Sequence, residues 1–303
     1  GEAGDVAMSV EISSDGKYAV SRITRGQNIG LAVIDLVHGT IRHIPGLHEA
    51  AVIHPAEPLL ISALDDRFIM RNIQTGEVLQ SWTNPYTIKG QLIWLPRQSS
   101  LGSLVCPVLI DNEPTICVID IESSMISFKV QGMYAVPSTD FQTLYTYLPS
   151  ENQLLVYDAN SMKLLRSGSL DGLGSGRLTL DANNQRIASS SPDDQAVMLW
   201  DIETLNRVAV FSNDGYVSDL SWSPDGTRFL TTWDNSIHIL DSYPVGKRAQ
   251  MRSALAKELG INTQRATDAD DVQQSNAAEQ RAKQIRDLLN GLRESQFMTM
   301  DGS

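Results

Sequence analysis

The sequence predicts an all-β propeller of about six visible four-stranded blades, followed by a C-terminal α-helical extension. Three observations favour this fold class. A motif repeats about every forty residues, tight-turn residues stand at matching places in each repeat, and the periodicity changes from β-type to helical near residue 245. The chain of 303 residues is long enough to bury a large core.

The repeated motif is a short β-rich run that ends in Asp or Asn and is followed by a turn. It occurs at Val33-Ile34-Asp35-Leu36, Met70-Arg71-Asn72-Ile73, Val118-Ile119-Asp120-Ile121, Val156-Tyr157-Asp158-Ala159, Leu199-Trp200-Asp201-Ile202 and Ile239-Leu240-Asp241-Ser242. Successive Asp or Asn positions are 37, 48, 38, 43 and 40 residues apart. This spacing is typical of one four-stranded blade, so each motif marks a blade.

Turn residues support the same division into strands. A polar turn such as His38-Gly39 or Thr75-Gly76 follows the Asp or Asn position. An earlier turn, clearest in Ser14-Asp15-Gly16-Lys17 and Ser223-Pro224-Asp225-Gly226, joins the first two strands. We therefore predict strands a to d in each blade, counted from the inside out, with about five or six residues each.

Some of these residues resemble a known family. Trp200-Asp201, together with Ser221-Trp222-Ser223-Pro224-Asp225-Gly226 and Leu240-Asp241, is similar to WD40-repeat propellers. The resemblance covers residues 6–243 and is most specific in the last two repeats. The family's Gly-His dipeptide is missing, with Leu47-His48 its nearest equivalent, so the family's buried Asp-His-Ser-Trp network is not expected to be complete in any blade.

The sixth repeat lacks a fourth strand. Pro244 stands where strand d would begin, and proline cannot donate to a sheet ladder. Three explanations remain open: a three-stranded last blade, a ring closed by tail residues, or upstream residues that supply the strand and a seventh blade. Because the sequence begins at Gly1 without Met, we expect the natural protein to extend further at its N-terminus.

The tail follows a propeller domain of residues 1–243 and comprises residues 244–303. We predict a helix at 246–259 stopped by Gly260, a linker at 261–270, a helix at 271–293 and a disordered end. The second helix carries an apolar stripe that includes the contact residues Ile285, Leu288, Leu289 and Leu292. Docking on the propeller, binding of a partner and self-association through this helix all remain open.

Composition and charge exclude several classes of protein. The net charge is -12, and residues 1–244 hold 28 acidic against 15 basic side chains, which disfavours a nucleic-acid partner. No apolar stretch approaches the ~20 residues that span a bilayer, so no membrane partner is predicted. We expect a cytoplasmic protein, although a targeting signal upstream of Gly1 would be missing from this sequence.

No catalytic, cofactor or metal signature is visible. The chain has no G-x-S-x-G, H-E-x-x-H, P-loop or C-x-x-C motif, and the glycine run at 172–176 reads as a loop. The five histidines share no metal-ligand spacing and read as surface or turn residues. Cys106 and Cys117, which could face each other across a hairpin, read as buried small hydrophobic residues. The sequence thus predicts a protein that is not an enzyme.

The candidate binding residues are aromatic or charged and lie in loops at one rim. In a propeller, the b–c and d–a loops emerge on the same rim. This set comprises Asp65, Asp66, Arg67, Trp82, Tyr134, Asp194, Tyr216, Trp233 and Asp234, with Tyr86 among them. Aromatic residues mixed with charges are typical of protein-binding hot spots. We therefore predict a protein-interaction scaffold.

Two other functions remain open. The first is a propeller enzyme or small-ligand binder that uses the central channel. The second is a regulatory domain attached to an upstream catalytic domain. The segment Tyr243-Pro244-Val245-Gly246-Lys247-Arg248-Ala249 is similar to tails of bacterial WD40-repeat proteins, some of which follow a protein kinase domain.

Overall fold

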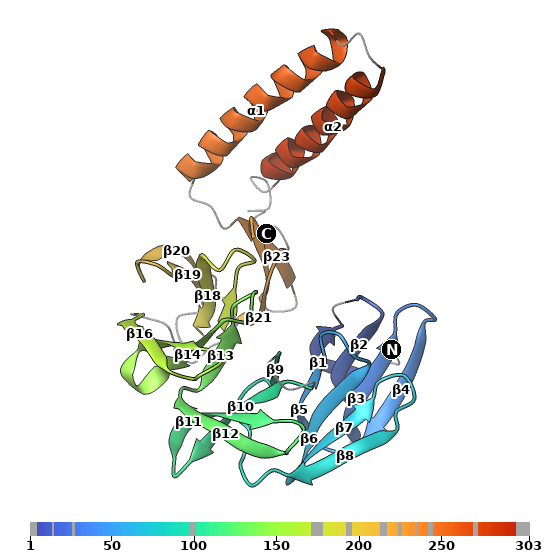
Figure 1. Cartoon of the computed structure of the whole chain (residues 1–303), viewed down its shortest axis with the longest axis vertical. Helices are drawn as coiled ribbons and strands as arrows, with labels where there is room; N and C mark the ends of the chain where they lie inside the picture. Colours follow the sequence, from blue (N-terminus) through green and yellow to red (C-terminus); the bar gives the residue numbers. More distant parts are fainter. Residues whose placement is uncertain are drawn as a thin grey trace. The chain divides into compact units, whose positions relative to one another are not determined.

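The computed structural model describes residues 5–13, 15–25, 28–96, 101–170, 178–191, 196–212, 217–223, 226–233, 236–241, 245–268 and 272–294. The chain forms two compact units, unit 1 at Gly1–Asp171 and unit 2 at Gly172–Ser303. The predicted fold class is confirmed, because six antiparallel sheets correspond to the six predicted blades and two helices follow them (Figure 1).

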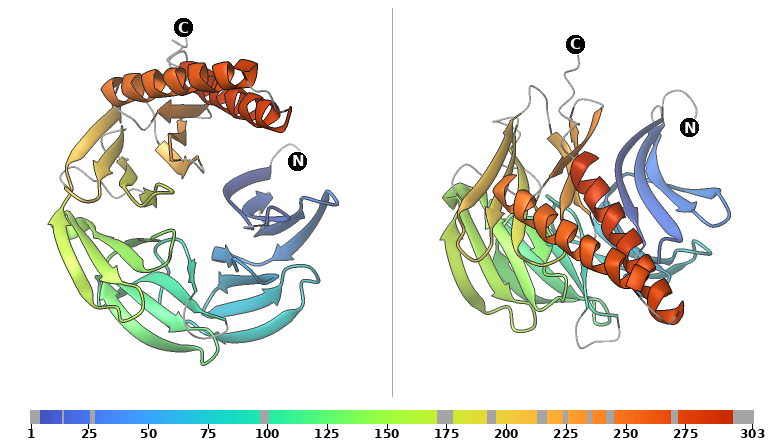
Figure 2. Two further views of the ribbon diagram at one scale, coloured as in Figure 1. Left: turned by 45° about the horizontal axis from the view of Figure 1, so that its top comes forward. Right: turned by 90° about the horizontal axis from the view of Figure 1, so that it is seen from above.

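Unit 1 contains blades 1 to 4, each of which is a four-stranded antiparallel meander (Figure 2). The strands are β1 (Asp5–Ile12), β2 (Tyr18–Arg25), β3 (Asn28–Asp35) and β4 (Thr40–Pro45) in blade 1; β5 (His48–Ile53), β6 (Leu59–Leu64), β7 (Arg67–Asn72) and β8 (Val78–Thr83) in blade 2; β9 (Ile93–Leu95), β10 (Ser103–Ile110), β11 (Glu113–Asp120) and β12 (Met125–Gln131) in blade 3; β13 (Tyr134–Pro137), β14 (Thr143–Leu148), β15 (Gln153–Asp158) and β16 (Leu164–Ser169) in blade 4. A short 3-10 helix (Pro149–Glu151) joins β14 to β15.

The blades of unit 1 contact one another mainly through their inner strands. Strand β5 contacts β1, β2, β3 and β9, while β13 contacts β9 and β10. Apolar side chains fill each of these junctions. The largest cluster among the described residues joins blades 2 and 3 and includes Phe68, Trp94, Leu104 and Cys117. Burial of apolar surface between neighbouring blades, on the order of 25 cal/mol per Å² of apolar area, is thus what holds this unit together.

Unit 2 contains blades 5 and 6 and the two helices. Blade 5 consists of β17 (Leu178–Leu180), β18 (Arg186–Ser191), β19 (Ala196–Asp201) and β20 (Arg207–Ser212). Blade 6 consists of β21 (Val217–Trp222), β22 (Arg228–Trp233) and β23 (Ser236–Asp241), and β21 contacts β17 and β18 of blade 5. Among the described residues, blade 6 therefore has the three strands that the sequence predicts for it.

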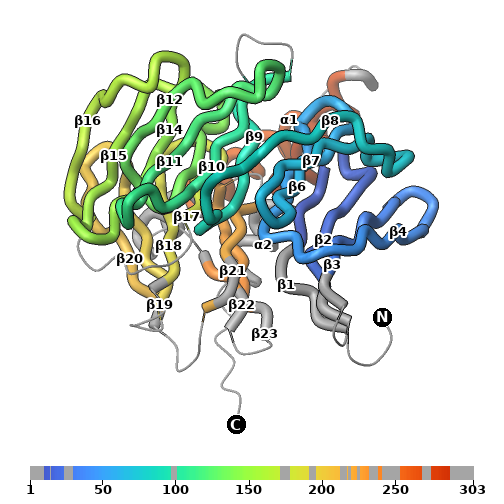
Figure 3. Tube along the Cα trace, turned by 90° about the horizontal axis from the view of Figure 1, so that it is seen from below, coloured from blue at the N-terminus to red at the C-terminus, as the bar shows by residue number. Residues whose placement is uncertain are grey.

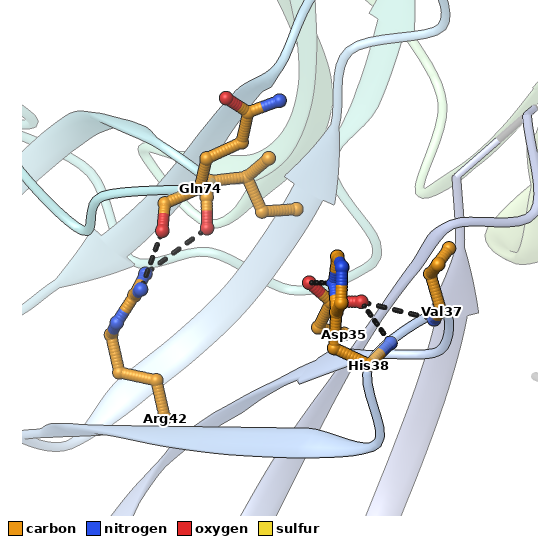
Figure 4. A network of polar contacts seen from close by, with 6 residues as sticks. Asp35, Val37, His38, Arg42 and Gln74 are labelled. Atoms are coloured by element: carbon orange, nitrogen blue, oxygen red, sulfur yellow. Dashed lines mark hydrogen bonds and ion pairs between the residues drawn. The ribbon is translucent and has the colours of Figure 1, made fainter.

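The repeated Asp or Asn folds the turn between strands c and d. In blade 1 the Asp35 carboxylate accepts hydrogen bonds from the backbone N–H groups of Val37 and His38, both at 2.9 Å (Figure 4). Equivalent bonds form to Asn72, Asp120, Asp158 and Asp201. A side-chain acceptor at this place satisfies backbone donors that the strand ladders leave free. In blades 1 to 5, the residue that marks the blade in the sequence is therefore a turn residue.

Side chains of the outer strands reach the c–d turn of the next blade. In Figure 4, the Arg42 guanidinium on β4 lies against the turn of blade 2 and donates to the carbonyl oxygens of Ile73 and Gln74. One blade further, Gln80 on β8 donates to the hydroxyl of Ser124 at 2.8 Å. These polar contacts supplement the apolar junctions between the blades.

The two C-terminal helices lie side by side and antiparallel (Figure 1). Helix α1 runs from Val245 to Asp268 and α2 from Val272 to Glu294. Ala278, Ala282 and Ile285 are buried on α2, and Arg281 forms an ion pair with Glu258 of α1 at 2.9 Å. Small residues at two successive turns of α2 let the helices approach closely. The apolar stripe predicted on the second helix is thus engaged within a helical hairpin at these positions.

The predicted end of the first helix at residue 259, with a linker at 261–270, was wrong. Helix α1 passes through Gly260 and continues to Asp268. The polar segment after Gly260 stays helical because it packs along α2: Ser275 donates to the carbonyl of Ala266, and Asn262 and Thr263 bond back to preceding carbonyls. Tertiary contacts here outweigh the low helix propensity of glycine.

Replacing Gly260 with alanine is expected to stabilise the hairpin by about 1 kcal/mol, because alanine loses less backbone entropy in a helix and a Cβ at this position meets no atom within 4 Å. The matched control is Gly39→Ala, which also meets no atom within 4 Å but stands at φ +66°. Thermal unfolding followed by circular dichroism should show a higher midpoint for the first variant and a lower one for the second. A lower midpoint for Gly260→Ala would contradict the continuous helix.

Candidate functional site

The b–c turn of blade 2 presents three charged side chains. Asp65 and Asp66 form the turn between β6 and β7, and Asp65 has a left-handed φ of 52°. Arg67 and Asp66 lie 3.6 Å apart with side chains that are 65% and 75% exposed. An ion pair this exposed contributes little to stability, so both charges remain available to a partner. The sequence analysis predicted these three residues for a binding rim, and the structure places them together at the b–c turn.

The loop that joins blades 2 and 3 contacts this turn. The backbone N–H of Asn84 donates to the carbonyl of Asp66 at 2.6 Å. Further along the loop, Ile88 forms a β-bridge with Val108, and the N–H of Lys89 donates to the carbonyl of Pro107. Loop 84–92 is therefore fixed between the b–c turn of blade 2 and the b–c hairpin of blade 3.

The b–c hairpin of blade 3 is longer than its neighbours. Strands β10 and β11 pair over eight residues each, and the hairpin closes through Asp111 and Asn112 at φ 52° and 67°. Two successive positive φ values identify a type I′ turn, for which Asp and Asn are favoured residues. Asp111, Asn112 and Glu113 are all exposed. We name residues 65–67, 84–92 and 110–113 together the b–c rim.

Aromatic side chains support this rim. Trp82 is half-buried beneath it, with its ring centroid 5.6 Å from that of Phe68. Tyr86 is half-buried within loop 84–92, and the Lys129 ammonium of β12 donates to its hydroxyl at 3.3 Å and lies 5.5 Å from its ring centroid. A ring between a basic side chain and the rim surface is a rigid contact group.

Two buried donors lie at the same place. The Nε1 of Trp82 and the Nδ2 of Asn84 have no hydrogen-bond acceptor among the residues that the structure describes. The side-chain Oδ1 of Asn84 does accept a hydrogen bond from the backbone N–H of Tyr86 at 3.2 Å. Asn84 is only 3% exposed. Buried donors without an acceptor are uncommon in native proteins, and they mark this part of the rim as incompletely satisfied.

Of the remaining predicted rim residues, Tyr134 alone has a described side chain. Tyr134 begins β13 of blade 4 and is half-buried. Trp233 ends β22, but its side chain is outside the described part, and Asp194, Tyr216 and Asp234 fall outside the described residues. On the tail, Ile285 is fully buried, whereas the side chains of Leu288, Leu289 and Leu292 on α2 are not described.

Sequence reasoning missed Asn84, Lys89, Lys129 and the hairpin tip. One signal could have found the tip, because Asp111-Asn112 between two apolar runs is typical of a type I′ hairpin. No local sequence pattern marks Asn84 or Lys129. The position of Asn84 depends on the bridge between Ile88 and Val108, and the position of Lys129 depends on strand pairing within blade 3. These positions depend on contacts between segments far apart in the sequence.

A buried polar group lies near the start of blade 2. The expectation of a surface or turn position was wrong for His48, which is 1% exposed at the start of β5. Burial lowers the pKa of His48, so the ring is neutral at pH 7.

Arg71 holds the position that Trp200 has in blade 5, and its guanidinium donates to Ser62 at 3.1 Å. Blade 2 thus contains an Arg–Ser pair where blade 5 has tryptophan.

The two cysteines are buried in the core of blade 3. Cys106 and Cys117 lie directly opposite each other on β10 and β11, as free and buried thiols. Burial raises the pKa of both thiols, which keeps them protonated and unreactive at neutral pH. The interpretation of these residues as small core hydrophobic groups is confirmed.

Two kinds of feature are absent from the part of the chain that the structure describes. No group of three or more His, Cys, Asp or Glu side chains is arranged to hold a metal ion there. Within the same residues, neither helix is long and apolar enough to cross a bilayer.

Comparison with known proteins gives one family. The family described as WD domain, G-beta repeat matches residues 205–241, which span β20 and the strands of blade 6. No curated protein sequence matches the chain significantly. Propellers of this family are generally protein-interaction scaffolds and are typically non-catalytic. The matched segment agrees with the two repeats in which the sequence resemblance is most specific.

Proposed function

Because the chain is a WD40-like β-propeller, we propose that it is a non-catalytic protein-interaction scaffold and that a partner protein binds the b–c rim of blades 2 and 3. The fold class alone does not select a function, so the proposal depends on the rim. The observation that carries it is the loop 84–92, which joins the exposed charges of two blades into one surface around Tyr86.

The composition of this rim fits protein recognition. Tyr86 supplies a rigid aromatic group, while Asp66, Arg67 and Lys89 supply exposed charges of both signs. Phe68 and the hairpin β10–β11 hold these groups from below, so a partner would meet a surface that is already ordered. Preorganisation of this kind reduces the entropy that binding costs.

Charge reversal at the rim tests the proposal. In affinity capture from a cell extract with the full chain as bait, Asp66→Lys combined with Glu113→Lys is expected to reduce recovery of a bound protein at least tenfold. Reversed charges oppose the partner's complementary groups and leave them unpaired. The matched control, Glu77→Lys with Glu122→Lys, reverses the same number of exposed charges at the c–d turns of the same two blades.

The control variant should recover the same proteins as the unmodified chain. Circular dichroism of both variants must match the unmodified chain before capture is compared. Undiminished recovery by the rim variant would remove the site assignment. The absence of any protein retained by the unmodified chain but not by bare resin would count against the scaffold function itself.

A further inference from the structure

The outermost strands of unit 1 differ in charge from the rest of the chain. Strands β4, β8, β12 and β16 contain no Asp or Glu, although the whole chain has 36 acidic residues. Three of the four carry a basic residue, namely Arg42, Lys129 and Arg166. These strands are terminal strands of their sheets and lie at the outside of them (Figure 3), so one edge of each has no neighbouring strand within its own sheet.

Strand β16 is exposed along almost its whole length, as β4 is. Leu164 and Leu165 are 48% and 57% exposed, and only Gly168 among its six residues is half-buried. In β12, by contrast, Ile126, Phe128 and Val130 are half-buried. Exposed leucines on an edge strand favour pairing with another chain, a hazard that proteins usually avoid by blunting the edge.

The backbone of β16 leaves a ladder open on its outer side. The N–H of Leu170 donates to the carbonyl of Asn152, and Gly168 and Arg166 pair with Leu154 and Val156 at successive two-residue steps. Because hydrogen-bonding direction alternates along an antiparallel strand, the N–H and C=O of Ser167 point away from β15. An added strand could therefore continue the sheet at this residue.

Charge selects the kind of strand that fits. The exposed side chains of Lys163 and Arg166 flank the two leucines, and β16 itself contains no Asp or Glu. An incoming strand with glutamate or aspartate beside aliphatic residues would pair its charges with the two basic residues and its apolar groups with the leucines.

From this arrangement we infer that the outer edge of β16 is a second docking site, which takes an extended acidic and aliphatic segment of a partner protein as a fifth strand of blade 4. This site lies on the side of unit 1, away from the b–c rim, and it does not depend on the rim being a binding surface. Main-chain hydrogen bonds would supply affinity, and Lys163 and Arg166 would supply selectivity for acidic segments.

A synthetic peptide tests the inference directly. A fluorescein-labelled octapeptide of alternating valine and glutamate is expected to bind the full chain saturably and to slow hydrogen exchange of the β16 amides. A peptide of alternating valine and lysine should bind at least tenfold more weakly.

Ser167→Pro removes the outward N–H, and proline is tolerated on edge strands, so this variant should bind the acidic peptide at least tenfold more weakly. Ser167→Ala, the matched control, should bind as the unmodified chain does.

If Ser167→Pro fails to fold, N-methylated versions of the acidic peptide test the same hydrogen bonds. Methylation of alternate peptide nitrogens blocks the ladder without changing the protein, so one of the two registers of methylation should abolish binding. Equal binding by the acidic and basic peptides would overturn the inference. Binding that survives both methylated registers, or slowed exchange confined to other strands, would overturn it as well.

Discussion

Replacing Phe68 with alanine is expected to lower the free energy of unfolding by about 3–5 kcal/mol. Phe68 is 1% exposed and belongs to the largest described apolar cluster, between blades 2 and 3. Truncation removes the transfer free energy of the ring and leaves a cavity against Trp82, whose ring centroid is 5.6 Å away. Because total stability of a domain is typically only 5–15 kcal/mol, this single change removes much of it.

Urea denaturation followed by tryptophan fluorescence measures the effect. The matched control is Phe68→Leu, which keeps most of the apolar volume and is expected to cost about 1–2 kcal/mol. Since Trp82 underlies the b–c rim, the alanine variant should also weaken partner capture more than the leucine variant does. A loss below about 1 kcal/mol for Phe68→Ala would show that the junction of blades 2 and 3 does not hold unit 1 together.

Replacing Glu11 with glutamine is expected to make the protein more stable at pH 8 while changing little at pH 4.5. Glu11 lies on β1, and its carboxylate accepts a hydrogen bond from the N–H of Ile53 on β5 at 2.9 Å. Burial of the carboxylate raises the pKa of Glu11 to about 7, against an ordinary value of 4.5, and the hydrogen bond from Ile53 only partly opposes this shift.

The direction follows from proton linkage. The folded state holds the Glu11 proton more tightly than the unfolded chain does, so the stability from this group is fully present below pH 4.5 and is lost as pH rises towards 7. The complete loss amounts to about 3 kcal/mol. Glutamine cannot ionise and its carbonyl oxygen can still accept the bond from Ile53, so the variant escapes this loss.

Denaturation midpoints at pH 4.5, 6 and 8 provide the measurement. The difference between the variant and the unmodified chain should grow steadily between pH 4.5 and 7 and then level off. The control variant Gln80→Glu places a carboxyl group on an outer strand of the same unit. The difference between its denaturation midpoint and that of the unmodified chain should not change with pH in this way. A pH-independent difference for Glu11→Gln would contradict a buried, titrating carboxylate between blades 1 and 2.

The strands were predictable because each blade repeats its own turn chemistry. Asp35 and its equivalents fold the c–d turns through local hydrogen bonds, and a local interaction leaves a local pattern in the sequence. The end of α1 was not predictable in this way. Gly260 is an ordinary stop signal, and only the pairing with α2, visible in the bond between Ser275 and Ala266, carries the helix past it.

The candidate site was predictable in part for the same reason. Asp65, Asp66 and Arg67 stand in a turn that the sequence marks, so their exposure could be expected. Trp82 was predicted on the rim, but the structure packs its ring against Phe68 beneath it. The roles of Asn84 and Lys129 arise from contacts between segments far apart in the sequence, which neither spacing nor composition encodes.

Site-specific photo-crosslinking tests the b–c rim as a protein-binding surface most directly. A benzophenone amino acid would replace Lys89 on the rim or, in a second variant, Thr75 in the c–d turn of blade 2; both side chains are exposed. After irradiation in cells that make the full chain, the rim position is expected to yield a discrete covalent adduct with another protein, and the turn position none. Adducts from Thr75 alone, or equal adducts from both positions, would contradict binding at the rim.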